Sequence, residues 1–197
     1  MVLWTPIPGE TPIDASGLKI LVTTRSELNV AEAKNIRKAM AKYLVTRPNA
    51  RKAPFDMPWA LRLHREMFGN VWTWAGKPRD GSAVVNIGVP SYQVEPMLLC
   101  LLEDVKRWPT TNMTMLEQAA TLHHRAVKIH PFRNGNGRWS RLLANIWLRR
   151  HGHEVIEWLE GKLGEQTEER GKYLAAIASA DDGDCGPLMK LQERFVT

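Results

Sequence analysis

The stretch HPFRNGNGRWSR, which runs from His130 to Arg141, decides how the second half of this chain folds. The residues before it, 116–129, carry apolar side chains at the spacing of one helical face. Pro131 stops that helix, so we expect His130 at its C-terminal end. The apolar run LLANIWL follows directly and predicts a second, buried helix that begins at about Gly137. The stretch is therefore expected to be a short turn between two packed helices.

The turn consists of residues that tolerate positive backbone φ angles: Asn134, Gly135, Asn136 and Gly137. Such residues allow several successive backbone N–H groups to point at one place, where they bind an anion. The unpaired N–H groups at the start of the next helix, and the positive end of its dipole, strengthen that site for phosphate. We therefore predict an anion-binding nest between the two helices.

Two arginines, Arg138 and Arg141, follow the nest three residues apart and are expected on one face of the new helix. Arginine is unfavourable at the positive end of a helix dipole, so the pair favours a bound anion such as a polyphosphate. His130 is expected at the edge of this site, and an ordinary histidine pKa of about 6.5 suits a general base. The pattern predicts transfer of a phosphate-containing group to a hydroxyl.

The stretch closely resembles the signature of Fic-domain proteins, the Fic/Doc family. That signature runs His-Pro-Phe, any residue, an acidic residue, Gly-Asn-Gly-Arg, two residues and Arg. Three other segments resemble the sequence of the Fic core: Phe68–Arg79 (FGNVWTWAGKPR), Asn86–Val94 and Arg170–Asp184. The resemblance implies a mainly α fold, a Fic-type helical bundle with a small β-hairpin flap. It also implies a protein adenylyltransferase, which moves AMP from ATP to a hydroxyl side chain of a target protein.

The resemblance gives a role to the residues of the signature. His130 is implied to be the catalytic general base, and Phe132 a core anchor. Arg138 is expected on the β-phosphate side of ATP and Arg141 at the γ-phosphate. The implied nucleotide-binding residues are Gly135, Asn136, Gly137, Arg138 and Arg141.

Asn134 stands where AMP-transferring members of the family usually carry a metal-binding carboxylate. An amide oxygen can bind a hard cation, but without the negative charge. Asn134 is therefore a weak candidate ligand for the implied Mg²⁺ or Mn²⁺. The alternative function is a nucleotide-binding regulatory module with little transferase activity, which acts through a partner protein. Gly137 followed by Arg138 favours the nucleotidyl-transferring pattern over that of the Doc kinases, which have lysine at the glycine position.

The segment 72–92 is rich in glycine and turn-forming residues and contains two β-prone pieces, Ser82–Val85 and Asn86–Val89. We predict a small hairpin or extended flap here in an otherwise helical chain. By the resemblance, this flap docks the target protein through main-chain hydrogen bonds. The predicted docking residues are Val84, Val85, Asn86, Ile87, Gly88 and Val89.

Many Fic proteins carry an inhibitory helix whose glutamate pairs with the second arginine of the signature, here Arg141. The helix is marked by Ser or Thr, three residues, Glu, and then Gly or Asn. Thr23 and Glu27 have the right separation, but Leu28 replaces the Gly or Asn. Glu160 is followed by Gly161, but Ile156 occupies the first position of the motif. The chain therefore contains no strict copy of it.

Glu27 and Glu32 are the candidate autoinhibitory residues for pairing with Arg141. For Glu27, a capping box with Thr24 at the start of a predicted helix 24–43 is the favoured alternative.

Further apolar patterns predict helices at residues 59–68, 93–108, 116–129, 137–150 and 165–179. We expect residues 1–58 to form an N-terminal arm and helix that pack on a Fic core of residues 59–197, in a single globular domain overall. His123 and His124 precede the signature on its first helix. We expect them to be packed or hydrogen-bonded rather than catalytic.

The composition predicts one globular domain, with 44% hydrophobic and 24% charged residues in a chain of 197. The N-terminus lacks a signal-peptide pattern, and the apolar runs are shorter than the ~18 residues of a membrane span. Two cysteines without disulfide or metal-ligand spacing favour a reducing compartment, so we expect a cytoplasmic protein. A net charge of +6 makes nucleic acid a weaker alternative partner, because the basic residues are dispersed.

The N-terminal sequence, which includes TTRSELNVAEAKNI, is similar to that of a small bacterial Fic subfamily called mobile mystery protein B. That likeness implies a toxin-like or regulatory protein with a helix-turn-helix or antitoxin-like partner. The other implied partners are ATP and an unknown target protein, with no membrane.

Overall fold

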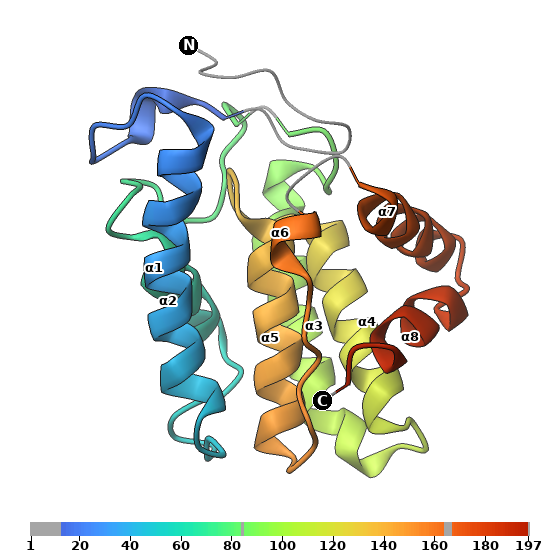
Figure 1. Ribbon diagram of the computed structural model, residues 1–197. Coiled ribbons are helices and arrows are strands. Elements are labelled where there is room, and N and C mark those ends of the chain that lie inside the picture. The colour runs from blue at the N-terminus through green and yellow to red at the C-terminus, as the bar shows by residue number, and fades with distance from the viewer. Residues whose placement is uncertain (1–12, 84, 164–166, 197) are drawn as a thin grey trace.

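The computed structural model describes residues 13–83, 85–163 and 167–196, and these residues are mostly helical (Figure 1). The predicted mainly α fold is confirmed. Helix α5 stands between α1 on one side and α7 and α8 on the other. Within the described residues, no helix is long and apolar enough to cross a membrane. The described helices are η1 (Ala15–Gly17), α1 (Arg25–Leu44), α2 (Met57–Phe68), α3 (Ser91–Arg107), η2 (Trp108–Thr110), α4 (Met115–Ile129), α5 (Asn136–Arg150), α6 (Glu160–Leu163), α7 (Glu168–Asp181) and α8 (Gly186–Glu193).

Helix α1 begins with the predicted capping box. The Thr24 hydroxyl accepts a hydrogen bond from the Glu27 amide at 3.2 Å, and the Glu27 carboxylate accepts one from the Thr24 amide at 3.1 Å. A second capping box, formed by Thr114 and Glu117, begins α4. Each box satisfies backbone N–H groups that have no partner inside the helix, so local sequence defines both helix starts. The favoured alternative for Glu27 is therefore confirmed.

Helices α4 and α5 form the centre of the fold. They pack against each other, and every residue of α5 from Trp139 to Leu148 is buried. Phe132 is fully buried between these helices and contacts Trp139 edge to face, with 5.0 Å between the ring centres, which confirms it as a core anchor. A second apolar cluster, which includes Leu148 and Leu188, joins α4 and α5 to α7 and α8. The helix carrying the nest is thus supported from both sides.

Two short helices after the signature, α6 and α8, are absent from the sequence prediction. Helix α6 has four residues, too few for an apolar period to show. Helix α8 has eight residues and contains a proline in its first turn, which reads equally well as a loop signal. The predicted helix 165–179 corresponds to α7, which the structure describes from Glu168.

The prediction for this region was a small hairpin or extended flap. The described residues of 82–89, which are all but Val84, contain no strand, so the hairpin is not supported. Asp80 instead organises a turn, because its carboxylate accepts hydrogen bonds from the Ser82 amide at 3.0 Å and the Ser82 hydroxyl at 2.5 Å. Gly88 has a φ of 126°, which interrupts an extended strand. Neither of the two β-bridges recorded between described residues, Leu18 with Trp72 and Ile156 with Val196, involves this segment.

The N-terminal helix and the rest of the chain share one core. Helix α1 packs on α2 and α5, and its residues Leu28 and Tyr43 belong to the main apolar cluster. The predicted division between residues 58 and 59 falls in the first turn of α2. That division stays a prediction.

Candidate active site

His130 is the C-cap of α4 and has a left-handed backbone with φ 53°. Its side chain is buried, and Nδ1 lies 3.3 Å from the Val127 carbonyl oxygen. A carbonyl oxygen accepts hydrogen bonds and cannot donate, so Nδ1 carries the proton and Nε2 keeps its lone pair. Burial, helped by the charge of Arg79, lowers the pKa of His130 to about 4. The imidazole is therefore neutral at pH 7.

Arg79 holds the main chain around His130, a role that local sequence does not reveal. Its Nε donates to the His130 carbonyl oxygen at 2.6 Å, and its Nη2 donates to the Val89 carbonyl oxygen. Its backbone N–H donates to the Pro131 carbonyl oxygen at 2.8 Å. The guanidinium thus lies at the negative, C-terminal end of α4, where a cation is favourable. Arg79 joins the segment that ends at Val89 to the backbone of His130.

The turn after Phe132 leads directly into the N-terminus of α5, where the anion nest is predicted. Gly135 is the N-cap of α5 with φ 78°, and no side chain caps this helix end. A Cβ at Gly135 would lie 2.7 Å from the Phe68 ring, so the position requires glycine for conformation and for space. The Asn136 side chain accepts from the Phe132 amide and donates to its carbonyl oxygen, both at 2.8 Å. The Asn136 side chain therefore closes the turn, and its backbone remains at the nest.

Asn134 is held at both its side chain and its backbone. Its Oδ1 accepts from the Gly135 amide at 2.6 Å, and its carbonyl oxygen lies 3.0 Å from His64 Nε2. Nδ1 of His64 accepts from the Gly76 amide at 3.0 Å, so Nε2 carries the proton and donates to Asn134. Burial lowers the pKa of His64 to about 3, so its ring is neutral. His64, which anchors the turn to α2, was not among the residues predicted from the sequence.

These residues do not by themselves form a metal site. Among the described residues, no group of three or more His, Cys, Asp or Glu side chains is arranged to hold a metal ion. The Asn134 Oδ1 is neutral and already accepts a hydrogen bond from Gly135. Mg²⁺ is usually held by one or two carboxylates together with water and substrate phosphates. The turn offers one neutral oxygen in their place.

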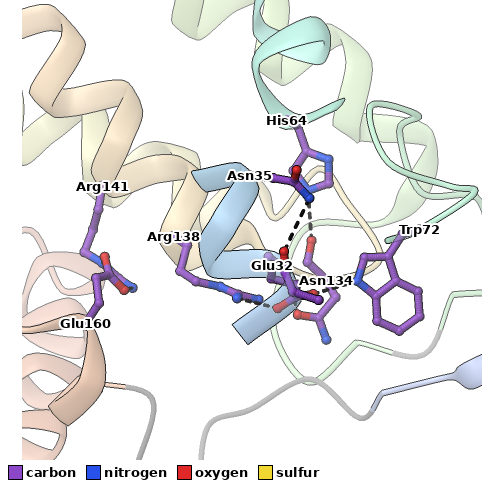
Figure 2. Close-up of polar contacts among 10 residues, drawn as sticks. Glu32, Asn35, His64, Trp72, Asn134, Arg138, Arg141 and Glu160 are labelled. Atoms are coloured by element: carbon purple, nitrogen blue, oxygen red, sulfur yellow. Dashed lines mark hydrogen bonds and ion pairs between the residues drawn. The ribbon is translucent and has the colours of Figure 1, made fainter. Parts of the chain in front are cut away.

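The two arginines of the signature are each paired with a carboxylate from a different helix (Figure 2). Nη1 of Arg138 lies 2.5 Å from an oxygen of Glu32 on α1. The other oxygen of Glu32 accepts from Trp72 Nε1 at 2.6 Å, and Glu32 is only 4% exposed. The Arg138 guanidinium also lies 4.9 Å from the centre of the Phe68 ring. Arg138 is thus held toward α1.

Arg141 is held toward α6 instead. Its Nε and Nη2 donate to the two oxygens of Glu160 at 2.7 Å and 2.5 Å. Burial alone would lower the pKa of Arg141, but the Glu160 carboxylate outweighs burial and raises it. The predicted pairing of Arg141 with Glu27 or Glu32 is wrong, because Glu27 caps α1 and Glu32 lies on the Arg138 side of the nest. Glu160 is the carboxylate that pairs with Arg141, although Ile156 makes its copy of the inhibitory motif incomplete.

A cavity of about 520 Å³ opens over the nest and is lined by residues of α1, the signature, α6 and α7. That volume is in the usual range for small-ligand sites. The structure therefore brings the candidate catalytic and nucleotide-binding residues of the sequence analysis to one cavity. Residues from the signature, α1 and α6 that line it include His130, Asn134, Gly135, Asn136, Gly137, Arg138, Arg141, Asn29, Ala33 and Glu160.

The described part of the proposed docking segment lies beside His130. Ile87 is 46% exposed and lines the same cavity. Gly88 packs so closely that a Cβ there would lie 2.7 Å from the Cβ of His130. Val89 is held by Arg79 through its carbonyl oxygen. The candidates for docking that the structure describes are Val85, Asn86, Ile87, Gly88 and Val89, all exposed or half-exposed.

The fold and the site define a helical protein in which an uncapped helix N-terminus, two arginines and a buried neutral histidine share one cavity. Residues 54–148 match the sequence model of the Fic/DOC family. This part of the chain is therefore a Fic/DOC family domain, which confirms the resemblance at the level of the family.

Curated relatives match the chain over about 135 residues. This chain is 33% identical over 136 residues to "Protein adenylyltransferase fic-1" of Caenorhabditis briggsae. It is 32% identical over 135 residues to "Protein adenylyltransferase Fic" of Drosophila ananassae. Each match covers 66% of this chain and 25% of the relative. The chain thus spans about a quarter of the length of these relatives, which are animal proteins. None of them supports the likeness to mobile mystery protein B.

Solved structures share the fold over most of the chain. The BepC protein of Bartonella tribocorum, solved with bound AMPPNP, has a TM-score of 0.68 at 19% identity, with 97% of this chain and 95% of that chain covered. Fic-1 of Caenorhabditis elegans has a TM-score of 0.64 at 26% identity, with 92% and 52% covered. These likenesses confirm the Fic-type helical fold.

Proposed function

We propose that this protein is a protein adenylyltransferase, which transfers AMP from ATP to a hydroxyl side chain of a target protein. The observation that carries the proposal is the placement of His130 next to the nest. Its Nδ1 faces the Val127 carbonyl oxygen, so the lone pair of the neutral ring is on Nε2, the nitrogen that would accept a proton. The curated relatives named protein adenylyltransferases support the same reaction.

In the proposed reaction, His130 takes the proton of the target hydroxyl as that oxygen attacks the α-phosphorus of ATP. The bond between the α-phosphorus and the bridging oxygen breaks, and pyrophosphate leaves. The backbone of Gly135, Asn136 and Gly137 holds phosphate at the N-terminus of α5. Arg138 and Arg141 carry the charge that faces the β- and γ-phosphates. The low pKa of His130 supports this role because the ring is unprotonated at pH 7.

A divalent cation, Mg²⁺ or Mn²⁺, belongs to the proposal as a weakly held partner of ATP. When bound it would neutralise phosphate charge. Asn134 is the ligand that this chain would supply, as a neutral oxygen. We therefore expect transfer to need a higher metal concentration than it would with a carboxylate at residue 134.

The segment 84–89 is proposed to dock the target. Ile87 faces the cavity and Arg79 ties Val89 to the backbone of His130, so an extended target chain along this segment would pass close to the general base. Main-chain donors and acceptors of the segment would bind the target without regard to its side chains.

Glu160 and Glu32 are proposed to restrain the enzyme. Each carboxylate neutralises one arginine that ATP would need. A polyphosphate must compete with them, because one guanidinium cannot give the same N–H groups to two anions at full strength. Glu27 has no such part, since it belongs to the cap of α1.

The second candidate function is a nucleotide-binding regulatory module with little transferase activity. The neutral Asn134 and the paired arginines favour it. A toxin-like role, a bacterial subfamily, a helix-turn-helix or antitoxin-like partner and a cytoplasmic location remain proposals from the sequence.

The test uses the purified protein, cell extract and ATP labelled at either the α- or the γ-phosphate. The α-label should remain on protein and the γ-label should not. His130→Ala should lower the labelling rate about 10²- to 10⁴-fold and leave ATP affinity unchanged, because the base is lost and the nest is kept. His153→Ala, an exposed histidine outside the cavity lining, is the matched control. Transfer of the γ-label, or full activity of His130→Ala, would refute the proposal.

A further inference from the structure

Arg141 is enclosed by aromatic side chains of the C-terminal region. Its guanidinium carbon lies 5.5 Å from the centre of the Tyr173 ring and 5.9 Å from that of Trp158. Arg141 and Tyr173 are each 6% exposed. Burial lowers the pKa of Arg141, whereas Glu160 and then Tyr173 raise it. Tyr173 is therefore a second partner of Arg141, besides Glu160.

The Tyr173 hydroxyl continues into a buried polar chain. It lies 3.1 Å from His123 Nε2 on α4, and His123 Nδ1 lies 3.5 Å from the side-chain amide of Gln192 on α8. His123 and Gln192 are both fully buried. This series of polar side chains therefore runs from α5 through α7 and α4 to α8, and all its members are buried.

The direction of the protons in this chain follows from the chemistry of its members. Arginine has donors and no acceptor, so in a hydrogen bond between the two groups the Tyr173 oxygen accepts from Arg141. The hydroxyl proton of Tyr173 then points to His123 Nε2, which must be the unprotonated ring nitrogen. Burial, with the charge of Arg141, lowers the pKa of His123 well below its ordinary value, so the ring is neutral and its proton is on Nδ1.

The last link depends on how the side-chain amide of Gln192 is turned. With the amide of Gln192 as placed, its nitrogen faces His123 Nδ1 and its Oε1 is buried without a hydrogen-bond partner. Two donors then face each other. Rotating the amide by 180° exchanges its nitrogen and oxygen, and the choice between the two orientations is made from the hydrogen-bond network. The oxygen then accepts from Nδ1–H, and every hydrogen bond in the chain has one donor and one acceptor.

We infer that Tyr173 is a positioning residue for Arg141, and that the Arg141–Tyr173–His123–Gln192 chain fixes its direction. This inference rests on the proposed use of Arg141 for the polyphosphate of ATP. Glu160 is an anion and competes with phosphate for the guanidinium, whereas the Tyr173 hydroxyl is neutral and does not. When phosphate replaces Glu160, Tyr173 keeps Arg141 aimed into the cavity. Helices α7 and α8 lie outside residues 54–148. The orientation of the Arg141 guanidinium therefore depends on helices beyond the matched domain.

The first experiment measures ATP and AMP binding to Tyr173→Phe by calorimetry without metal. Removing the hydroxyl should weaken ATP binding about 3- to 10-fold. AMP binding should stay unchanged, because AMP lacks the phosphates that Arg141 would face. Tyr92→Phe, at a 77% exposed tyrosine, should leave both affinities unchanged. Unchanged ATP affinity, or equal losses for ATP and AMP, would overturn the inference.

The second experiment needs no variant and no activity. Nitrogen chemical shifts of His123 in the wild-type protein should show Nδ1 protonated and Nε2 unprotonated. The reverse tautomer, or a charged ring at pH 7, would overturn the proton direction and with it the positioning chain. A failure of AMP transfer alone would appear in the labelling assay and would leave both of these measurements unaffected, so the two failures are distinguishable.

Discussion

Glu160→Gln should raise the affinity of the protein for ATP. The change removes one negative charge at almost constant size and leaves an oxygen that still accepts from Arg141. In the wild-type protein Glu160 binds both Nε and Nη2 of Arg141, at 2.7 Å and 2.5 Å. ATP must displace that carboxylate to use the same guanidinium. The variant lowers the cost of this displacement.

The magnitude follows from how far each partner is buried. The Arg141 side chain is 7% exposed, whereas that of Glu160 is 45% exposed. A buried hydrogen bond to a charged group contributes about 1.5–3 kcal/mol, and an exposed ion pair about 0–1 kcal/mol. The half-exposed position of Glu160 places the pair between these limits, at about 1–2 kcal/mol. That energy corresponds to about 5- to 30-fold tighter ATP binding.

Calorimetric titration with ATP at fixed ionic strength measures this change. Glu157→Gln is the matched control, because Glu157 is an exposed glutamate three residues away and is not part of the cavity lining. The control should change ATP affinity by less than about 2-fold, the size of a screened charge effect. Equal gains in both variants would mean that net charge, and not the contact with Arg141, governs binding. An unchanged affinity in Glu160→Gln would refute the competition.

Three further predictions concern the base, the docking segment and the metal. Because the pKa of His130 is lowered to about 4, the base is unprotonated above that pH, so kcat/KM should stay level as pH falls from 8 to 5. A halving near pH 6.5 would mean that His130 titrates as an ordinary histidine. Val85→Pro or Ile87→Pro removes a main-chain donor and should impair target modification more than ATP binding, and equal losses would make the segment structural. Asn134→Asp should lower the metal concentration needed for half-maximal transfer, and an unchanged requirement would exclude residue 134 as a ligand.

The turn and its helices could be predicted because their causes are local. Pro131 ends one helix, Gly135 allows the positive φ that starts the next, and Thr24 with Glu27 caps α1. Each of these effects acts within four residues of the chain. The hairpin is not supported for the opposite reason: a strand depends on distant residues, and the distant contact described here is Arg79, which ties Val89 to the backbone of His130.

Glu32 was a candidate partner of a signature arginine, but which carboxylate pairs with which arginine could not be predicted, because tertiary packing sets the pairs. Glu32 is 106 residues from Arg138 in the chain, and Glu160 is 19 residues from Arg141. Neither glutamate lies in residues 54–148, although both arginines do. The matched domain thus holds the groups that would bind ATP, and the flanking helices α1 and α6 hold the carboxylates that oppose binding. Relatives with the same signature and different flanks should therefore differ in ATP affinity more than in the chemistry at His130.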